Sequence, residues 1–177
     1  IFFYCYGVLH SPEYREQYAS DLKKVLPRVP YAPDFRAFEK AGRTLAALHL
    51  DYETVEPWPV TEEAKPKGDL NDLAYYRVEK MRFASKGGRE KDRSVIVFNS
   101  RITIKGIPEQ AYDYMVNGKS AIEWVMDRYE AATDKESGIK DDPNEWCRES
   151  NDPAYILNLL KRVIRVSMDT VEIVGGL

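Results

Sequence analysis

Hydrophobic and polar positions follow two different periods along this chain. Residues 80–83 and 101–105 alternate, with basic or hydroxyl side chains on one side and apolar side chains on the other. Successive side chains of a strand point to opposite faces of a sheet, so this alternation indicates strands. Residues 94–98 are apolar on both sides, which is typical of a central strand. The pattern predicts an antiparallel three-stranded β-meander with one apolar face and one basic face.

Helical spacing replaces alternation on both flanks of the predicted meander. Ser11 precedes a proline, and Asp34 precedes a stripe of apolar residues at helical spacing. Serine and aspartate are residue types that cap the first turn of a helix, and proline suits its first position. The helices expected from these signals and from apolar spacing lie at 1–26, 34–49, 107–117, 120–129 and from 153 onward. The predicted fold class is α+β, with N-terminal helices, a small antiparallel β-meander and C-terminal helices.

Proline and glycine divide the chain into three predicted parts. Residues 1–50 form a helical segment, 51–72 a linker or wrapping loop, and 73–177 an α+β domain. Residues 133–152 are polar and punctuated by proline and glycine, so we expect a long loop there with a brief turn near Trp146. With 177 residues, one domain is the default expectation and two small lobes remain possible. The chain has no initial methionine and begins within a pattern, which suggests a fragment of a longer polypeptide.

Positive charge is concentrated in the predicted meander. From Arg77 to Lys105 nine cations accompany three anions, a balance of 9 − 3 = +6, whereas the whole chain carries −3 and the remainder therefore −9. Such a local excess favours an anionic partner, and nucleic acid is the obvious one. The alternative is a solvated sheet face that binds nothing.

The candidate DNA-binding residues all come from this segment. Arginine, asparagine and threonine side chains reach both phosphates and base edges. We assign candidate base contacts to Arg77, Lys80, Arg82, Asn99, Arg101, Thr103 and Lys105. The glycine-rich connector at 84–92 is expected to be a mobile basic loop. Its Lys86, Arg89 and Lys91 are assigned to phosphates, and Arg93 completes the set.

The sequence offers no catalytic constellation. The tripeptide at 118–120 ends like a phosphate-binding loop, but the partner glycine is replaced by Asp113, so a helix cap is the better interpretation. His10 and His49 have no partner at metal or triad spacing. Cys5 and Cys147 match no metal or redox spacing and are expected to be reduced thiols of a cytoplasmic protein.

Several motifs resemble one known family. They are GVLHSPEYREQYASDLKKVLPRVP at 7–30, EKMRF at 79–83, NSRITI at 99–104, NGKSAIEWVMDRY at 117–129 and DPAYILNLLKRVI at 152–164. Together they resemble the C-terminal specificity domain, or target recognition domain, of the bacterial single-chain ATP-dependent Type ISP restriction-modification enzymes. The block at 117–129 is the most specific of them.

The resemblance implies a role without catalysis for this chain. A parent enzyme would carry a nuclease, a helicase-like ATPase and an adenine methyltransferase, and it would use ATP, Mg and S-adenosylmethionine. None of their motifs occurs here, so no catalytic residue is carried over, and no cofactor is expected in this part. The implied partners are double-stranded DNA and the methyltransferase and helicase-like domains of the same polypeptide.

Two other classes stay open at this point. One is an interaction domain that docks the motor to the methyltransferase without reading DNA, for which the apolar first helix and the acidic remainder are suited. In either case Tyr14 and Tyr18 are expected to pack on the methyltransferase or on linker helices. The other class is an enzyme with an unrecognised site.

Overall fold

The computed structural model describes residues 1–24, 27–64 and 71–177, and its elements form the predicted α+β fold. Two compact units are present, one of residues 1–55 with 168–177 and one of residues 56–167. The last helix, α8 (Tyr155–Gly175), contributes residues to both. Residues 25–26 of the predicted first helical segment and 65–70 of the predicted linker lie outside the described residues.

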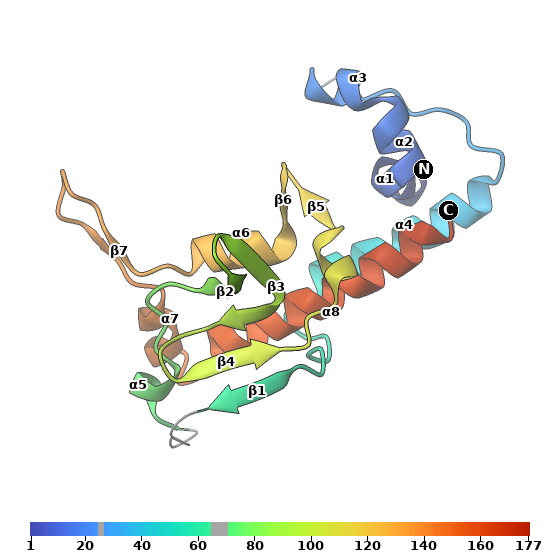
Figure 1. Cartoon of the computed structure of the whole chain (residues 1–177). Helices are drawn as coiled ribbons and strands as arrows, with labels where there is room; N and C mark the ends of the chain where they lie inside the picture. The colour runs from blue at the N-terminus through green and yellow to red at the C-terminus, as the bar shows by residue number, and fades with distance from the viewer. Residues whose placement is uncertain (25–26, 65–70) are drawn as a thin grey trace. The chain divides into compact units, whose positions relative to one another are not determined.

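The first unit is built from helices that the sequence predicted. They are α1 (Phe2–His10), α2 (Pro12–Gln17), α3 (Ala19–Lys23) and α4 (Phe35–Leu50) (Figure 1). Asp34 caps α4 as expected, because its carboxylate accepts a hydrogen bond of 3.0 Å from the amide of Ala37. Tyr4, Val8 and Tyr14 form the buried centre of this helical cluster.

Two glycines allow α1 and α4 to pack backbone against backbone. A Cβ atom on Gly7 would lie 2.3 Å from the carbonyl oxygen of Phe38, and one on Gly42 would lie 1.8 Å from that of Phe3. Neither position has room for a methyl group. The guanidinium of Arg43 lies 4.3 Å from the ring centre of Phe3 and covers the neighbouring part of the contact.

A histidine pair lies inside this unit. The hydroxyl of Tyr6 is 2.8 Å from Nδ1 of His49, and Nε2 of His49 is 2.8 Å from the hydroxyl of Thr170. The ring of His10 lies 5.3 Å from that of His49. Burial, with the nearby His10, lowers the pKa of His49 to about 4. His49 is therefore neutral in the folded protein at physiological pH.

Acidification should destabilise this unit through His49. Its pKa is near 6.5 when unfolded and about 4 when folded, so its contribution is complete above pH 6.5 and is lost as pH falls towards 4. Because the ring is partly exposed, we expect a loss of about 1 kcal/mol between pH 7.5 and 5.0. Urea unfolding of the wild type and of His49→Gln at both pH values measures it. Equal pH dependence of the two proteins would contradict the assignment.

The second unit contains one antiparallel four-stranded sheet. Its strands are β1 (Thr61–Ala64), β2 (Arg82–Gly87), β3 (Glu90–Val97) and β4 (Ile102–Lys105), in the order β1-β4-β3-β2. The predicted meander of β2, β3 and β4 is confirmed. Within the predicted linker or wrapping loop at 51–72, residues 61–64 form a strand that was not predicted, because β1 pairs with β4. β1 has no apolar alternation of its own, so no sequence signal marked it.

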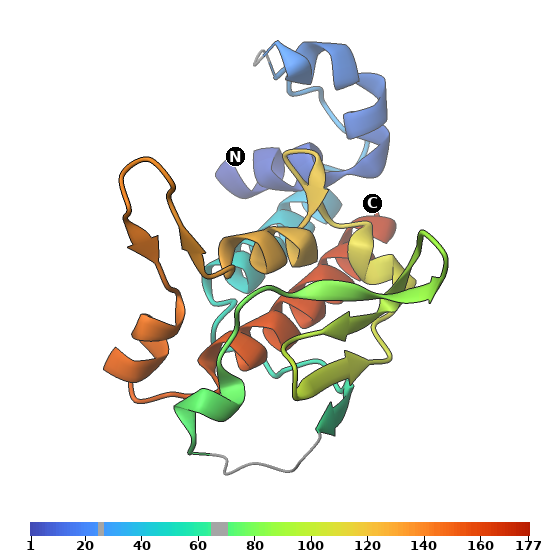
Figure 2. The ribbon, with the colours of Figure 1, turned by 60° about the vertical axis from the view of Figure 1, so that its left-hand side comes forward.

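One face of the sheet is covered by α8 (Figures 1 and 2). Ile96, Ile102 and Ile104 of the sheet are fully buried, as are Leu160 and Ile164 of the helix. Two contacts tie the start of the sheet to α8. The amide of Trp58 donates to the carbonyl of Lys161, and the Lys161 ammonium lies 2.5 Å from the Glu62 carboxylate. With α8 on this side, the opposite side carries Thr103 and Lys105 of β4 and, paired with them, Val97 and Val95 of β3 (Figure 1).

The expected mobile loop at 84–92 is a continuous hairpin instead. β2 and β3 extend through it and meet at a turn in which Gly87 has φ +123° and Gly88 φ +60°. A φ of +123° is open only to glycine and a φ of +60° favours it, which explains the Gly-Gly pair. Figure 2 shows this green hairpin projecting from the sheet.

The remaining elements of the unit are short. They are α5 (Leu73–Tyr76), the 3₁₀ helix η1 (Glu109–Tyr112), β5 (Met115–Val116), β6 (Lys119–Ser120), α6 (Ala121–Arg128), β7 (Ala132–Thr133), β8 (Lys140–Asp141) and α7 (Asn144–Glu149). Ser120 and Glu123 form a capping box that begins α6, as the helix-cap interpretation of 118–120 required. No described helix has the length and apolar content needed to cross a membrane.

Two loop and helix expectations were wrong here. The predicted helix at 107–117 is a single 3₁₀ turn, and Asn117-Gly118 does not end a helix. Both residues have positive φ, of 49° and 85°, so they form the tight turn of the β5–β6 hairpin. In the predicted loop at 133–152, the brief turn expected near Trp146 is the six-residue helix α7, and the β7–β8 hairpin was not predicted.

Candidate nucleic-acid interface

The strand register places part of the predicted set on the open face of the sheet. Arg82 is paired with Val97, Val97 with Thr103 and Thr103 with Glu63, so these residues form one row across all four strands. Residues directly opposite each other in antiparallel strands share a face. Lys105 is two residues beyond Thr103 and lies on that face as well. The alternation in the sequence therefore predicted this face correctly.

Five of the predicted residues line one groove beside this row. The groove has a volume of about 290 Å³ and is lined by Arg77, Lys80, Arg82, Asn99 and Arg101, together with Ala74, Glu79, Val97 and Ser100. These residues come from the α5–β2 segment, from β3 and from the turn before β4. Three arginines and a lysine thus converge on one hollow of the surface.

Asn99 holds the groove in shape. Its amide nitrogen donates to the carbonyls of Tyr75 and Arg77, both at 3.0 Å. Its oxygen accepts from the amides of Arg101 and Ile102, both at 2.8 Å. These bonds use both amide protons, so the side chain has no free donor for a base. The sequence prediction of Asn99 as a base contact is untested, and the geometry gives it a positioning role.

Four predicted cations are paired with carboxylates of the same chain. Arg77 with Asp142, Lys80 with Glu130 and Lys105 with Glu63 are each separated by 2.7 Å, and Arg93 with Glu123 by 3.3 Å. These four carboxylates lie outside 77–105, so the local excess of +6 falls to 6 − 4 = +2. All four pairs are partly exposed, and such pairs contribute at most about 1 kcal/mol, so a phosphate can compete for the cation.

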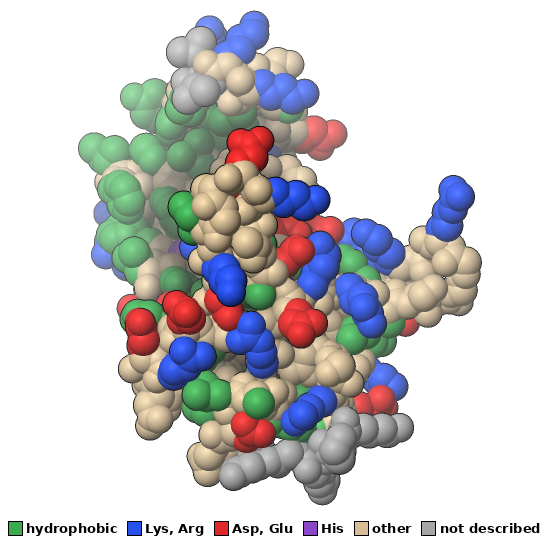
Figure 3. All heavy atoms as spheres, turned by 90° about the vertical axis from the view of Figure 1, so that its left-hand side faces the viewer, with side chains coloured by type: hydrophobic (Ala, Val, Ile, Leu, Met, Phe, Trp, Pro, Cys, Tyr) green, Lys and Arg blue, Asp and Glu red, His purple; other side chains and the backbone are tan. Residues whose placement is uncertain are grey.

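The other predicted cations are not neutralised in this way. Within the described part of the chain, no ion pair is found for Arg82, Lys86, Arg89, Lys91 or Arg101. The guanidinium of Arg101 lies 6.0 Å from the ring centre of the buried Tyr75. Figure 3 shows Lys and Arg side chains interspersed with Asp and Glu on this side of the molecule. The surface is therefore mixed in charge, with Arg82 and Arg101 as its unpaired groove cations.

Lys91 and Arg93 lie away from the open face. The β2–β3 pairing shifts register between Phe83 and Ala84, which turns the outer part of the hairpin relative to the sheet. As a result Arg93 lies 4.2 Å from the ring centre of Tyr112, and Lys91 5.9 Å from that of Phe83. Lys91 lines a second hollow of about 400 Å³ with residues of α6. Lys86 and Arg89 are exposed near the hairpin tip.

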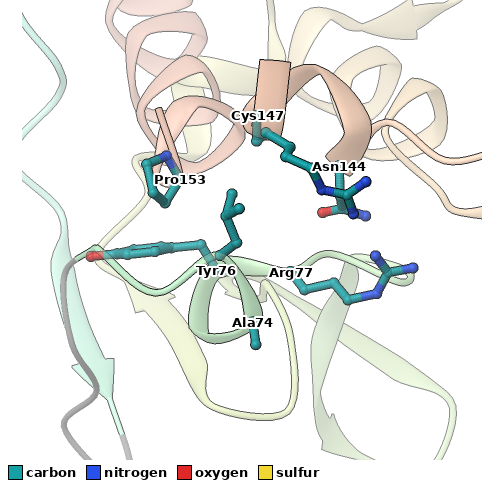
Figure 4. Close-up of a pocket in the computed structure, with 8 residues that line it drawn as sticks. Ala74, Tyr76, Arg77, Asn144, Cys147 and Pro153 are labelled. Atoms are coloured by element: carbon teal, nitrogen blue, oxygen red, sulfur yellow. The ribbon is translucent and has the colours of Figure 1, made fainter. Parts of the chain in front are cut away.

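Asn144 of α7 and the preceding Asp142 hold the segment that lines the groove, and no pattern in the sequence marked them. The Asn144 side chain is bonded to both the amide and the carbonyl of Val78, at 2.8 and 2.7 Å. Burial pushes the pKa of Asp142 upwards, but hydrogen bonds from Asn144 and Arg77 outweigh it and hold that pKa below its usual value. Asp142 is thus charged at neutral pH and orients Arg77. Figure 4 shows Arg77 and Asn144 on facing segments.

The described residues hold no group of three or more His, Cys, Asp and Glu side chains arranged for a metal ion. Cys5 and Cys147 are free thiols, and burial raises the pKa of Cys147. A buried thiol with a raised pKa is a poor nucleophile. The chemistry that this surface supports is recognition of an anionic, hydrogen-bonding partner.

Comparison with known proteins supports the same class of partner. The family model for the Type ISP C-terminal specificity domain matches residues 1–159. No curated protein matches the chain. Among solved structures the chain is similar to three protein–DNA complexes. They are a nuclease-deletion mutant of the Type ISP restriction-modification enzyme LlaGI in complex with a DNA substrate mimic, the ATP-dependent Type ISP restriction-modification enzyme LlaBIII bound to DNA, and a DrdV–DNA complex.

The similarity extends over nearly the whole chain. Sequence identity is 48% to LlaGI, 44% to LlaBIII and 34% to DrdV, and the TM-scores are 0.84, 0.86 and 0.78. Each comparison covers 99% of this chain. It covers 13%, 11% and 17% of those three chains, respectively, so this chain corresponds to a small part of each relative.

Proposed function

This chain belongs to the Type ISP C-terminal specificity domain family, and on that basis we propose that it reads the DNA target sequence of a restriction-modification enzyme. The observation that carries the proposal is the groove beside the open sheet face, where the unpaired Arg82 and Arg101 converge. Arginine bonds guanine through two hydrogen bonds in the major groove, and each such pair discriminates by about 1–3 kcal/mol. The relatives named above were solved with DNA, which agrees with this role.

We propose different tasks for the cations of this surface. Arg82, Arg101 and Thr103 contact bases, because they lie on the open face or line the groove without an ion pair. Lys86 and Arg89 contact phosphates from the hairpin tip, where they are exposed on a projecting strand pair. The ion-paired cations Arg77, Lys80 and Lys105 contact phosphates only by exchanging their carboxylate partners. Lys91 and Arg93 contribute mainly to the packing around Phe83 and Tyr112.

Catalysis would belong to other parts of a longer protein. A nuclease, a helicase-like motor and an adenine methyltransferase would use Mg, ATP and S-adenosylmethionine there, and this chain would direct the methyltransferase to its site. The residues described above supply binding and orientation. This assignment includes a cytoplasmic location, where such an enzyme meets DNA.

A segment exchange in the full-length protein tests the proposal. Residues 75–105 are replaced by the equivalent segment of a relative with a different target, and bound duplexes are selected from a randomised pool and sequenced. We expect the wild type to enrich one sequence and the exchanged protein to enrich another. Enrichment of the same sequence by both proteins, or of none by the wild type, would contradict target recognition by this segment.

A second role, docking to neighbouring domains, is favoured by the first unit. Phe2 and Leu50 are exposed there by 69% and 80%, so each offers apolar surface to a neighbouring domain. The two roles differ in their salt dependence. Sequence-selective DNA binding that weakens steeply between 50 and 200 mM salt, roughly, supports the reading role. Binding to a neighbouring domain without salt-sensitive DNA binding supports docking alone.

A further inference from the structure

We propose that Arg148 of α7, together with Arg77, forms a DNA-phosphate site that extends the groove beyond the sheet. The inference rests on the proposed function, and it adds a residue that lies 43 positions after the basic segment. No sequence pattern marked Arg148, because its surroundings at 133–152 are mainly acidic and polar.

A further hollow adjoins the groove that Arg82 and Arg101 line, because the two share lining residues. A hollow of about 220 Å³ between α5 and α7 is lined by Leu73, Ala74, Tyr76, Arg77, Asn144, Cys147, Arg148 and Pro153. It shares Ala74 and Arg77 with the base-reading groove, so Arg77 stands at the junction of the two. Figure 4 shows Arg77 reaching from the α5 side towards the α7 segment that carries Asn144 and Cys147. A strand backbone that follows the groove past Arg77 therefore meets Arg148 next.

The charges at this junction suit a phosphate. The Asp142 carboxylate pairs with one of the two guanidiniums of the site, and its bonded oxygen Oδ2 is 2.7 Å from Arg77. Its other oxygen, Oδ1, accepts from the backbone and side chain of Asn144. Among the described residues no ion pair or side-chain hydrogen bond is found for Arg148. A guanidinium bonds a phosphate through two parallel hydrogen bonds, and Arg148 has all of its donors available.

The rest of the hollow fits the sugar rather than a second charge. Leu73, Ala74, Cys147 and Pro153 give it an apolar floor, and the raised pKa of Cys147 keeps that thiol uncharged. The Asn144 amide is occupied by Val78 and Asp142. An apolar floor beside two guanidiniums is complementary to a deoxyribose and its phosphate.

The backbone of α7 is held firmly enough to position Arg148. The two hydrogen bonds of Asn144 to Val78 fix the first turn of α7 to the segment before β2. The carbonyl of Cys147 accepts from the amide of Asp152 at 3.0 Å, which fixes the end of the helix. Only the side chain of Arg148 needs to become ordered on binding.

The test uses Arg148→Ala in the full-length protein and a fluorescent duplex of random sequence, titrated by anisotropy at several salt concentrations. We expect about a tenfold weaker affinity at low salt, and a plot of log affinity against log salt that is less steep by about one. Arg36→Ala, at an exposed arginine of α4 with no ion pair among the described residues, is the matched control and should bind like the wild type. Arg148→Lys should keep the salt slope and lose about threefold in affinity.

Two outcomes separate this inference from the proposed function. If the wild type enriches one target but Arg148→Ala has the wild-type salt slope, only the phosphate site is overturned. If the slope falls while the preference for the enriched target over a scrambled duplex is unchanged, the phosphate site is supported. A change in that preference would show that Arg148 reads sequence, which also overturns the inference. A wild type without any preferred sequence contradicts the proposed function itself.

Discussion

Gly42→Ala should destabilise the unit of residues 1–55 and 168–177 by about 3 kcal/mol or more. A Cβ atom at this position would lie 1.8 Å from the Phe3 carbonyl oxygen and 2.7 Å from the Gly7 amide nitrogen. Both obstacles are backbone atoms, so no side-chain rotation relieves the collision. Helices α1 and α4 must move apart, and the buried contacts of Tyr4 and Val8 are weakened with them.

Hydrogen exchange of the amides in α1 and α4 measures this effect locally. Gly175→Ala is the matched control, because nothing lies within 4 Å of a Cβ atom there and its conformation suits alanine. The control should be neutral or stabilising by up to about 1 kcal/mol. Equal protection in the two variants would contradict the close helix contact. Gly42→Ala also separates the two proposed roles, because docking through the first unit should suffer while the enriched DNA sequence stays the same.

The parts of the fold that local chemistry determines could be predicted from the sequence. Ile102 and Ile104 alternate with polar residues because one face of β4 is buried, so periodicity alone located the strand. The caps at Asp34 and Ser120 were recognisable because a cap needs only a side-chain oxygen and the next turn of helix. The open basic face followed from the same alternation.

The features that were missed depend on residues far apart in the chain. β1 is a strand because β4 offers it a free edge, not because of its own pattern. The register shift at Phe83 turns Lys91 and Arg93 towards aromatic rings, and a bulge of this kind has no signature in alternation. Asn117-Gly118 suits either a helix end or a hairpin turn, and the pairing of β5 with β6 decides between them.

Charge was the least reliable guide to the candidate site. Counting within 77–105 gave +6, but folding brings Glu63, Glu123, Glu130 and Asp142 next to four of the counted cations. Each comes from outside the counted segment and pairs with one of its cations. Long-range attraction to DNA scales with the net charge of the protein, whereas base recognition depends on where each side chain lies. The positions of the unpaired arginines are therefore a better guide to the candidate site than the total charge of the segment.

Arg82→Ala combined with Arg101→Ala should abolish most of the sequence preference. Each substitution is expected to weaken binding to the enriched target by about 1–3 kcal/mol, or roughly tenfold to a hundredfold. The side chains line one groove, so their effects should be coupled rather than strictly additive. Binding to a scrambled duplex should fall much less. Competition titrations of the full-length protein with both duplexes measure the ratio, which should approach one in the double variant.

Lys86→Ala with Arg89→Ala is the matched control, because it removes the same number of charges from the hairpin tip. It should weaken enriched and scrambled duplexes alike, by about tenfold, and leave their ratio intact. The contrast between the two variants depends on geometry. Lys86 and Arg89 are exposed at the tip of a projecting hairpin. The backbone amide of Arg101, in contrast, donates a hydrogen bond to Asn99, and Arg82 is paired within the sheet. A fixed guanidinium can distinguish bases, whereas an exposed, flexible cation responds mainly to phosphate charge. Should the tip variant lose the ratio and the groove variant keep it, base reading belongs to the hairpin.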